Sequence, residues 1–511
     1  MKKDFKAIDW EKYLPQPVCE EFPQYGEFYK KTWTLARAHV RDIEGMPQNP
    51  YMDEGFCDTQ IWIWDSCFMS LFCKFAQAVF PGIETFKNFY EVLYHGASLP
   101  SVIPTEEEPS WTGAKPNEAY PIKVHIADNP PLFAWAEYEN ALYHGDTEYL
   151  KELLYEKKAL QCHYEWLEGL HEKTRLANVH CNTHWIAENN GYKWEGGASG
   201  MDNTPRGRTG TVAERERPNN PDMYWLDAIC QQALSAKSIG RLFSFVGDVE
   251  NTKKWEEKFL VKKEIINRLY WDKEDKFYYD IDCNDKSFYK VATIASYWAL
   301  TAGIADKSQA QSMLEHLFDE NAFGGKVPLI SLSRADGDFQ ENGRYWRGAL
   351  WLPTAYAALK GLADYGFYKQ AQRLAYDLFK HMLATAEMVE PHTIWECYSP
   401  CKCEPSTKPN GQNRVRPDFC GWSALGPISI YLEFVLGFHS VNAFENRLDW
   451  EKPDCFKGKI GVKNLRFGGV TADIVADEEI CFVTTNKPFV LRINGKVFNA
   501  QAGENTFMIN G

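Results

Sequence analysis

The chain has 511 residues, of which 44% are hydrophobic and 25% are charged, which is ordinary for a folded protein with a large core. Its formal charge of −14 and the lack of any run of five basic residues exclude nucleic acid as an expected partner. Aromatic residues are abundant, at 15% of the chain. Such rings can line a groove, where their flat apolar faces suit a pyranose, or pack in a large core.

The amino terminus predicts no secretory signal, because Asp9 and Glu11 interrupt any apolar stretch after the first lysines. The most apolar window, residues 422–438, contains Pro427 and Glu433 and is expected to be a buried helix rather than a membrane span. No membrane partner is therefore expected.

Fourteen cysteines without an export signal indicate reduced thiols and a cytoplasmic protein, or a periplasmic one if a signal has been removed. One cluster lacks the paired C-x-x-C spacing of structural zinc sites. Its members are Cys397, Cys401, Cys403 and Cys420. We therefore expect no metal, and no other cofactor is predicted.

From about residue 25 to 440, apolar residues recur at spacings of three and four, which predicts one helix after another. The clearest stripes begin at Trp64, Leu153, Trp255, Leu352 and Leu425. Weaker helical patterns cover residues 30–43, 84–95, 131–143, 222–246, 291–303, 308–318 and 368–386. About a dozen helices are expected, a number that suits paired helices closed into a ring.

Four connections in this region are too long for simple turns, and long connections in a compact domain are usually functional or disordered. They cover residues 100–127, 178–220, 321–344 and 389–420. Tryptophans such as Trp111 and Trp185 occur in them, so we expect ordered walls of a site at one end of the ring.

After about residue 450 the pattern changes to short strands, and Asn494-Gly495 is typical of a hairpin turn. We therefore predict a helical domain over residues 1–445 and a small β-sandwich-like module over residues 446–511. The loops of the module contain no cluster of acids or rings, so a structural cap is favoured over a second sugar-binding site.

Two acids lie in separate loops that are rich in aromatic or turn-forming residues. Asp202 lies in G-A-S-G-M-D-N-T-P-R, and Glu396 lies in T-I-W-E-C-Y-S-P after Trp395. Hydrolysis of a glycoside requires two carboxyl groups with different environments, one protonated to assist the leaving oxygen and one ionised. Asp202 and Glu396 are the candidates for this pair.

Three further motifs bring rings and charges to the starts of predicted helices. Asp65 in W-I-W-D can contact ligand hydroxyls or simply support a helix N-terminus. Arg347 in Y-W-R-G can reach a carboxylate or sugar oxygen, or form a salt bridge between loops. Trp422 lies at another such junction, in F-C-G-W-S-A-L-G-P.

In chain order, the motifs W-D, G-M-D-N-T-P-R, Y-W-R-G-A-L-W, W-E-C-Y and G-W-S-A-L-G-P resemble those of the inverting α-glycosidases of glycoside hydrolase family 63 and their relatives, the trehalases. The resemblance covers roughly residues 55–437. It implies an (α/α)6 toroid with the active site at its wide end. It also implies that Asp202 is the general acid and Glu396 the general base.

The resemblance places the non-reducing sugar against the W-D and W-R-G motifs and Trp422. The predicted substrate-binding residues are Trp64, Asp65, Tyr345, Trp346, Arg347, Trp395 and Trp422. Two departures from the family pattern are Cys397 after the base, where asparagine is more usual, and two residues added before Gly200. Both leave the acid and base in place, and they bear on the leaving-group pocket.

The expected function is therefore exo-acting hydrolysis of a small α-glycoside or oligosaccharide with inversion, with α-glucosides first. The alternative is an α-mannosidase or a mannosyl- or glucosylglycerate hydrolase, for which a cation must bind the glycerate carboxylate. Arg206, Arg208 and Arg344 are candidates for that cation, or are paired with acids of the scaffold. No oligomeric state is predicted.

An inverting pair should lie roughly 6.5–9.5 Å apart and a retaining pair about 5–5.5 Å apart. Asp202 is expected to be the less solvated of the two, with a pKa raised by burial against Trp185 or Trp194. A rival interpretation is a sugar epimerase or isomerase on the same kind of ring, with histidines as acid and base. Its candidates are His125, His180, His184 and His392. A sugar-binding protein without catalysis would need neither acid.

Overall fold

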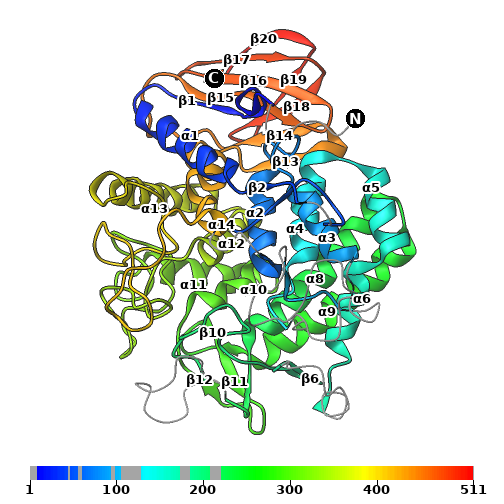
Figure 1. The fold of residues 1–511 in the computed structure, drawn as a ribbon, viewed down its shortest axis with the longest axis vertical. Helices are drawn as coiled ribbons and strands as arrows, with labels where there is room; N and C mark the ends of the chain where they lie inside the picture. The colour runs from blue at the N-terminus through cyan, green and yellow to red at the C-terminus, as the bar shows by residue number, and fades with distance from the viewer. Residues whose placement is uncertain are drawn as a thin grey trace.

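The computed structural model describes residues 8–43, 46–55, 60–91, 93, 98–104, 128–172, 184–207 and 220–509. Helices fill the body of the molecule, and a strand-rich region made mostly of the C-terminal residues lies at one end of it (Figure 1). The described part is mainly α, as the periodicity predicts.

Most helices coincide with the predicted stripes. They are α1 (Pro23–Arg37), α2 (Ile63–Cys73), α3 (Gly82–Glu91), α4 (Phe133–His144), α5 (Thr147–Lys151), α6 (Ala159–Glu168), α8 (Leu226–Phe245), α9 (Val249–Leu269), α10 (Trp298–Thr301), α11 (Lys307–Phe318), α12 (Leu352–Asp364), α13 (Tyr368–Met388), α14 (Cys420–Ser423) and the π-helices η3 (Glu152–Lys157) and η6 (Gly426–Val435). Local stop and start residues set several of these bounds. Asp306, for example, forms a capping box with Gln309 at the start of α11, and Gly145 ends α4 with φ 67°.

Seven inner helical segments contact one another in a closed cycle, in which α14 and η6 together occupy one position. Helix α2 contacts α4, α4 contacts α8, α8 contacts α10, and α10 contacts α12. Helix α12 contacts α14 and η6, and both of these contact α2. Every residue of α2 and of η6 is buried, whereas α9, which packs outside α8, buries only Trp255, Lys262 and Ile266. The difference follows from sequence, since a helix that is apolar all round must be covered on every side.

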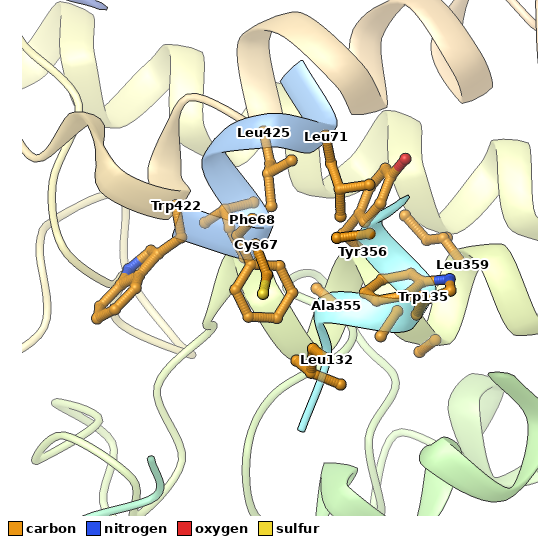
Figure 2. Close-up of a cluster of buried hydrophobic side chains, with 14 of the residues drawn as sticks. Cys67, Phe68, Leu71, Leu132, Trp135, Ala355, Tyr356, Leu359, Trp422 and Leu425 are labelled. Carbon is orange, nitrogen blue, oxygen red and sulfur yellow. The ribbon is translucent and has the colours of Figure 1, made fainter. Parts of the chain in front are cut away.

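The inner helices meet around a cluster of buried side chains, in which Phe68 and Leu71 of α2 face Trp135 of α4 and Tyr356 of α12 (Figure 2). Residues 422–438 form the end of α14 and η6 and are buried throughout, which confirms the predicted buried helix. Among the residues with a described position, no helix is both long and apolar enough to cross a bilayer.

The strand-rich region contains two sheets. One has the order β1 (Gln16–Cys19), β15 (Ile460–Phe467), β16 (Val470–Ala476), β17 (Ile480–Thr485) and β20 (Gly503–Met508). The other has the order β13 (Ser440–Asn442), β14 (Arg447–Trp450), β18 (Phe489–Ile493) and β19 (Lys496–Ala500). The sheets face each other, because Phe467 of β15 lies 5.6 Å from Phe489 of β18 between ring centres.

The predicted strands after residue 460 are all present, and the turn at Asn494-Gly495 has positive φ at both positions, as the hairpin requires. The sheets also take strands from outside residues 446–511. Strand β1 comes from the N-terminal segment and pairs with β15, and β13 pairs with β14 across the predicted boundary. Edge pairing of this kind depends on contacts between distant residues, so local pattern does not reveal it.

Short strand pairs occur in the loops of the helical part. They are β2 (Val40–Arg41) with β3 (Tyr51–Met52), β4 (Gln60–Trp62) with β5 (Val102–Pro104), β6 (Ile186–Glu188) with β7 (Gly191–Lys193), β9 (Trp271–Asp272) with β10 (Phe277–Tyr278), and β11 (Asp280–Asp282) with both β8 (Met223–Tyr224) and β12 (Phe288–Tyr289). Of these strands, β5, β6 and β7 lie in the predicted long connections over residues 100–127 and 178–220.

Candidate active site

The motifs singled out in the sequence lie at the N-terminal ends of three inner segments. Trp64 and Asp65 lie in the first turn of α2, Trp351 is the N-cap residue of α12, and Trp422 lies in α14 just before η6. Pro353 occupies the first turn of α12, where its missing N–H costs nothing. Because α2, α12 and η6 pack together, the three motifs meet at one end of the closed cycle.

Four tryptophans from these motifs form a continuous row. The rings of Trp64 and Trp422 lie 5.7 Å apart, and those of Trp422 and Trp351 also lie 5.7 Å apart. Trp351 stacks on Trp346 at 4.1 Å with an interplanar angle of 4°. Such contacts fix the relative positions of three loops that are far apart in the sequence.

Glu396 is 2% exposed and lies under a set of hydrogen-bond donors. The hydroxyl of Tyr345 donates to Oε1 at 2.8 Å, and the guanidinium of Arg416 lies 3.4 Å from the same oxygen. The backbone N–H of Arg416 donates to Oε2 at 3.3 Å. The indole of Trp422 donates to the backbone carbonyl of Glu396 at 2.8 Å. These donors hold the carboxylate and backbone of Glu396 in a fixed orientation.

Asp202 is partly exposed in a turn that follows a glycine-rich segment. Its neighbour Asn203 attaches this turn to the Y-W-R-G loop, since Asn203 Oδ1 accepts from the backbone N–H of Trp346 at 2.8 Å and Nδ2 donates to the carbonyl of Arg344 at 3.0 Å. The guanidinium of Arg347 donates to the carbonyl of Asn203 at 3.4 Å. The acid loop is therefore held against the loop that carries Tyr345.

Gly200 brings the same turn onto the tryptophan row. Its φ of 78° favours glycine, and a Cβ at this position would lie 2.4 Å from the ring of Trp64. The start of the loop is fixed by Glu195, whose carboxylate accepts from the backbone N–H groups of Gly197 at 3.0 Å and Ala198 at 2.5 Å.

Asp65 lies close enough to both candidate catalytic acids for their negative charges to affect its pKa. The pKa of Asp65 is raised to about 8, mainly by burial. The negative charges of Glu396 and Asp202 contribute to this rise, and Arg416 acts in the opposite direction. Its Oδ1 is buried and has no hydrogen-bond partner among the described residues. A buried carboxyl in this condition is suited to a hydroxyl group of a ligand.

The hydroxyl of Tyr345 is also affected by the charges of both candidate catalytic acids, Asp202 and Glu396. Burial raises the pKa of its hydroxyl well above the usual value, and the charges of Glu396 and Asp202 add to the rise. The hydroxyl therefore stays protonated and remains a hydrogen-bond donor to Glu396.

Asp202 was expected to be less exposed to solvent than Glu396, and this prediction is wrong. Glu396 is almost fully buried, whereas Asp202 keeps part of its surface exposed. Glu396 is hydrogen-bonded by Tyr345 and Trp422, while Asp202 lies in a turn. Trp185 and Trp194 pack against each other at 5.2 Å. The burial expected for Asp202 belongs instead to Asp65.

Of the two alternatives left open for Arg206, the structure shows pairing with scaffold acids. Arg206 is buried, and its guanidinium binds Asp227 at 2.7 and 2.8 Å and Asp280 at 2.7 and 2.8 Å. These bonds make it part of the scaffold behind the acid loop, so it is not available for a glycerate carboxylate. Arg344 donates to the carbonyl of Pro409 at 2.7 Å, and Arg208 lies outside the described residues.

The remaining predicted residues fall in the same region. Trp395 is buried beside Glu396, and its Nε1 has no partner among the described residues. Arg347 lies 3.8 Å from Asp338, so it also joins loops. Of the histidines, His184 lies 3.8 Å from Asp128 and Glu195, and His392 lies 3.0 Å from Glu390.

His125, His180 and Trp111 lie outside the described residues. Within the described ranges, no group of three or more histidine, cysteine or acidic side chains is arranged to hold a metal.

Two contributors were missed by the sequence reasoning. Arg416 contacts Glu396 and has a side chain that is 47% exposed, so it lies between the buried carboxylate of Glu396 and solvent. Asn203 positions the acid loop. A signal for Arg416 exists, since it is a cation between the Glu396 and Trp422 motifs. Asn203 directly follows Asp202, but only the fold shows which backbone groups it binds.

The sequence profile of the mannosylglycerate hydrolase MGH1-like glycoside hydrolase domain matches residues 58–413, and this range holds Asp65, Asp202 and Glu396. An uncharacterized protein of Borreliella burgdorferi is 25% identical over 330 residues, which are 63% of this chain and 62% of that protein. A cytosolic neutral trehalase of Kluyveromyces lactis is 28% identical over 225 residues, which are 42% of this chain and 29% of the trehalase. The aligned regions thus cover less than two thirds of either relative.

Among solved structures, a GH63 mannosylglycerate hydrolase from Thermus thermophilus in complex with glucose matches with a TM-score of 0.56 and 18% identity. The match covers 79% of this chain and 99% of that one. A GH78 family rhamnosidase of a Bacillus species matches with a TM-score of 0.59 and 12% identity, over 94% of this chain and 42% of the rhamnosidase. At these identities the likeness concerns the fold.

Proposed function

Because the chain belongs to the mannosylglycerate hydrolase MGH1-like family of glycoside hydrolases, we propose that it hydrolyses a small α-glycoside from its non-reducing end with inversion. Asp202 is the general acid and Glu396 the general base. The (α/α)6 toroid is the proposed architecture, and the closed cycle of inner helices supports it. Residues 1–445 form the proposed catalytic domain and residues 446–511 the core of the β module.

The proposal rests on one arrangement above all. The carboxylates of Asp202 and Glu396, on separate loops, both raise the pKa values of Asp65 and Tyr345. Both acids therefore lie near these two residues. The two acids differ in environment, since Glu396 is buried under donors and Asp202 is partly exposed. Such a difference lets one group stay ionised while the other supplies a proton.

The reaction follows from these roles. The proton of Asp202 goes to the glycosidic oxygen as the bond to the anomeric carbon breaks, and Glu396 removes a proton from the water that attacks that carbon from the opposite face. Tyr345 and Arg416 hold Glu396 in place. Trp64, Asp65, Trp346, Arg347, Trp395 and Trp422 bind the sugar.

α-Glucosides are the first proposed substrates, and mannosyl- or glucosylglycerate is the alternative. Removal of Arg206 from the candidate cations weakens the case for a glycerate carboxylate without excluding it, since Arg344 remains. The names of the Thermus thermophilus and Kluyveromyces lactis proteins make mannosylglycerate and trehalose the natural compounds to compare.

The decisive experiment follows the first-formed sugar by proton NMR with trehalose, mannosylglycerate, glucosylglycerate and nitrophenyl α-glycosides. The expected result is the β-anomer first. An α-anomer first would contradict inversion. Conversion of a free monosaccharide into another sugar would support an epimerase or isomerase, and binding without turnover would support a sugar-binding protein.

Two variants test the roles of the acids. Asp202→Asn and Glu396→Gln should each lower turnover by at least about a hundredfold with an unchanged circular dichroism spectrum. Glu404→Gln is a matched control, because Glu404 lies in the same long loop as Glu396 and is only half-buried. Wild-type turnover in either acid variant would refute its role.

A further inference from the structure

The imidazole of His184 faces two buried carboxylates beside the loop that carries Asp202. Its Nδ1 is 3.8 Å from Asp128 Oδ2 and 3.8 Å from Glu195 Oε1. The His184 side chain is 45% exposed, whereas those of Asp128 and Glu195 are 11% and 9% exposed. Neither the proposed acid and base nor the proposed sugar-binding residues include any of the three. This cluster therefore needs an explanation of its own.

Glu195 holds the start of the acid loop, which runs from this residue to Asp202. The carboxylate of Glu195 accepts from the backbone N–H groups of Gly197 at 3.0 Å and Ala198 at 2.5 Å. The backbone N–H of Gly200 in turn donates to the carbonyl of Gly197 at 3.2 Å. Hydrogen bonds thus connect Glu195 to Gly200, which lies two residues before Asp202. A shift of the Glu195 carboxylate is therefore passed on to the acid.

Asp128 joins the segment before α4 to the same cluster. Its Oδ2 accepts from the backbone N–H of His184 at 2.7 Å, and its backbone carbonyl accepts from the indole of Trp194 at 2.6 Å. The side-chain amide of the next residue, Asn129, donates to the carbonyl of Ala198 at 3.5 Å. The segment before α4 is thus bound both to His184 and to the acid loop.

One proton on His184 places a positive charge at the same distance from both carboxylates. Both carboxylates are buried, and attraction between charges is stronger in a buried setting than in water. If the cation is removed, two buried negative charges face a neutral side chain, and an uncompensated buried charge is destabilising. The Glu195 carboxylate relieves this by turning toward solvent, which releases the backbone N–H groups of the acid loop.

We propose that protonated His184 is a positioning residue for the general acid. It attracts Asp128 and Glu195, and through Glu195 it fixes the acid loop in the orientation from which Asp202 protonates the departing oxygen. In this role His184 touches neither the sugar nor the departing group. The inference rests on the proposed function, since it requires Asp202 to be the proton donor.

This role predicts that the effect of His184 depends on the leaving group. An alkoxide needs a proton to depart, so cleavage of an alkyl glycoside depends strongly on a correctly placed acid. Fluoride departs with little help from an acid, so cleavage of a glycosyl fluoride of the same sugar does not. Loss of the His184 cation should therefore slow the first reaction and spare the second, whereas a general loss of structure would slow both.

Steady-state kinetics with an alkyl α-glycoside and with the α-glycosyl fluoride of the same sugar tests this prediction. His184→Gln removes the cation, and His184→Arg keeps a cation that can bind carboxylates. His392→Gln is the matched control, because His392 is 48% exposed and lies 3.0 Å from Glu390, outside the acid loop. Thermal unfolding of each variant checks that it is folded.

His184→Gln should lower kcat for the alkyl glycoside by about tenfold, which is part of the contribution of a general acid, and should change kcat for the fluoride by less than about twofold. KM should stay the same for both substrates, because no contact with the sugar is lost. His184→Arg should retain at least about half of the wild-type kcat, and His392→Gln should match the wild type.

Three results would overturn the inference: an unchanged kcat in His184→Gln, equal losses with the two substrates, or a His184→Arg variant as impaired as His184→Gln. If His184→Gln does not fold, Glu195→Gln takes its place. That substitution removes a charge from the same cluster with little change in size, and it should also slow the alkyl glycoside and spare the fluoride.

Asp202→Asn, measured beside these variants, separates the two proposals. As the proton donor, Asp202 should show a larger version of the same pattern, with the alkyl glycoside slowed and the fluoride spared. If Asp202→Asn slows neither substrate or both equally, the proposed function fails and this inference fails with it. If Asp202→Asn shows the pattern and His184→Gln does not, only this inference fails.

Discussion

The two ends of the inner helices bury carboxylates in opposite ways. At the N-terminal ends of α2, α12 and η6, Asp65 is buried with one oxygen lacking a partner among the described residues, and Glu396 is contacted by the half-exposed Arg416. Near the other ends of these segments, the buried carboxylates of Glu139 and Glu433 face lysine ammonium groups. The same helices thus provide one end suited to a ligand and one end closed by charge pairs.

The paired end contains four charges from four helical segments. Lys74 binds Glu433 at 2.7 Å and lies 3.8 Å from Glu139. Lys360 binds Glu139 at 2.9 Å and lies 3.8 Å from Glu433. The hydroxyl of Tyr356 donates to Glu433 at 2.9 Å. Burial opposes ionisation of Glu139, but the two lysines lower its pKa below the usual value.

This contrast teaches that burial alone does not mark a functional acid. Arg206, Asp227 and Asp280 are as buried as Asp65, yet both carboxylates are hydrogen-bonded to the guanidinium of Arg206 within the scaffold. Asp65 differs because burial exceeds compensation, and its pKa rises to about 8. Buried charge that remains uncompensated indicates a place where a ligand completes the structure.

The largest effect is expected from breaking the paired end. Glu433→Gln leaves Lys74 without its nearest counter-charge and should lower the free energy of unfolding by about 3 kcal/mol. Denaturant unfolding measures this change. Glu148→Gln, which removes an exposed ion pair with Lys151, should change it by less than about 0.5 kcal/mol. Equal effects of the two substitutions would show that the four-charge cluster contributes no more than a surface pair.

A smaller effect with a defined pH dependence is expected at the site end. Because the pKa of Asp65 is raised in the folded state, the folded protein binds a proton that the unfolded chain has lost, so the stability falls as pH rises between the two pKa values. Asp65→Asn removes this dependence. The variant should gain about 2 kcal/mol of stability relative to the wild type between about pH 5.5 and about pH 7.

Thermal unfolding of both proteins across this range checks the sign as well as the size. Other titrating groups are shared by the two proteins and cancel in the difference. A constant difference across the range would mean that Asp65 is ionised throughout, and the contrast between the two ends would be lost.

The smallest effect tests how the acid loop is positioned on the tryptophan row. Gly200→Ala should lower kcat/KM by about tenfold, because the added methyl group meets the Trp64 ring and moves the turn that carries Asp202. Gly247→Ala is a matched control, since Gly247 has the same φ of 78° but nothing within 4 Å of an added Cβ. Both should lose similar backbone stability, about 1 kcal/mol.

Steady-state kinetics on the best substrate separates these two variants. If Gly247→Ala loses as much activity as Gly200→Ala, general strain explains the result. If neither loses activity, contact between Gly200 and Trp64 does not position the acid.

Much of the site was predictable because its residues form short motifs whose chemistry is local. The W-D, Y-W-R-G and G-W-S motifs were placed at the starts of predicted helices and W-E-C-Y in a long loop. The structure joins the first three through the Trp64, Trp422, Trp351 and Trp346 row, and Trp422 donates to the backbone carbonyl of Glu396. What failed were statements about surroundings. Asp202 was expected to be the less solvated acid, and Glu396 is the more buried one. For Arg206 the sequence left two alternatives open, and the structure shows pairing with Asp227 and Asp280 of the scaffold.

The sequence by itself determined the helical body, the C-terminal strands with the turn at Asn494-Gly495, and the acids Asp202 and Glu396 as candidates. These follow from periodicity and turn chemistry, which act between neighbours in the chain. Only the tertiary structure decided that β1 joins the C-terminal sheet, that Glu396 is more buried than Asp202, and that Asp65 retains an unpaired oxygen among the described residues. Burial and charge compensation are properties of contacts between residues far apart in the sequence, so no local pattern encodes them.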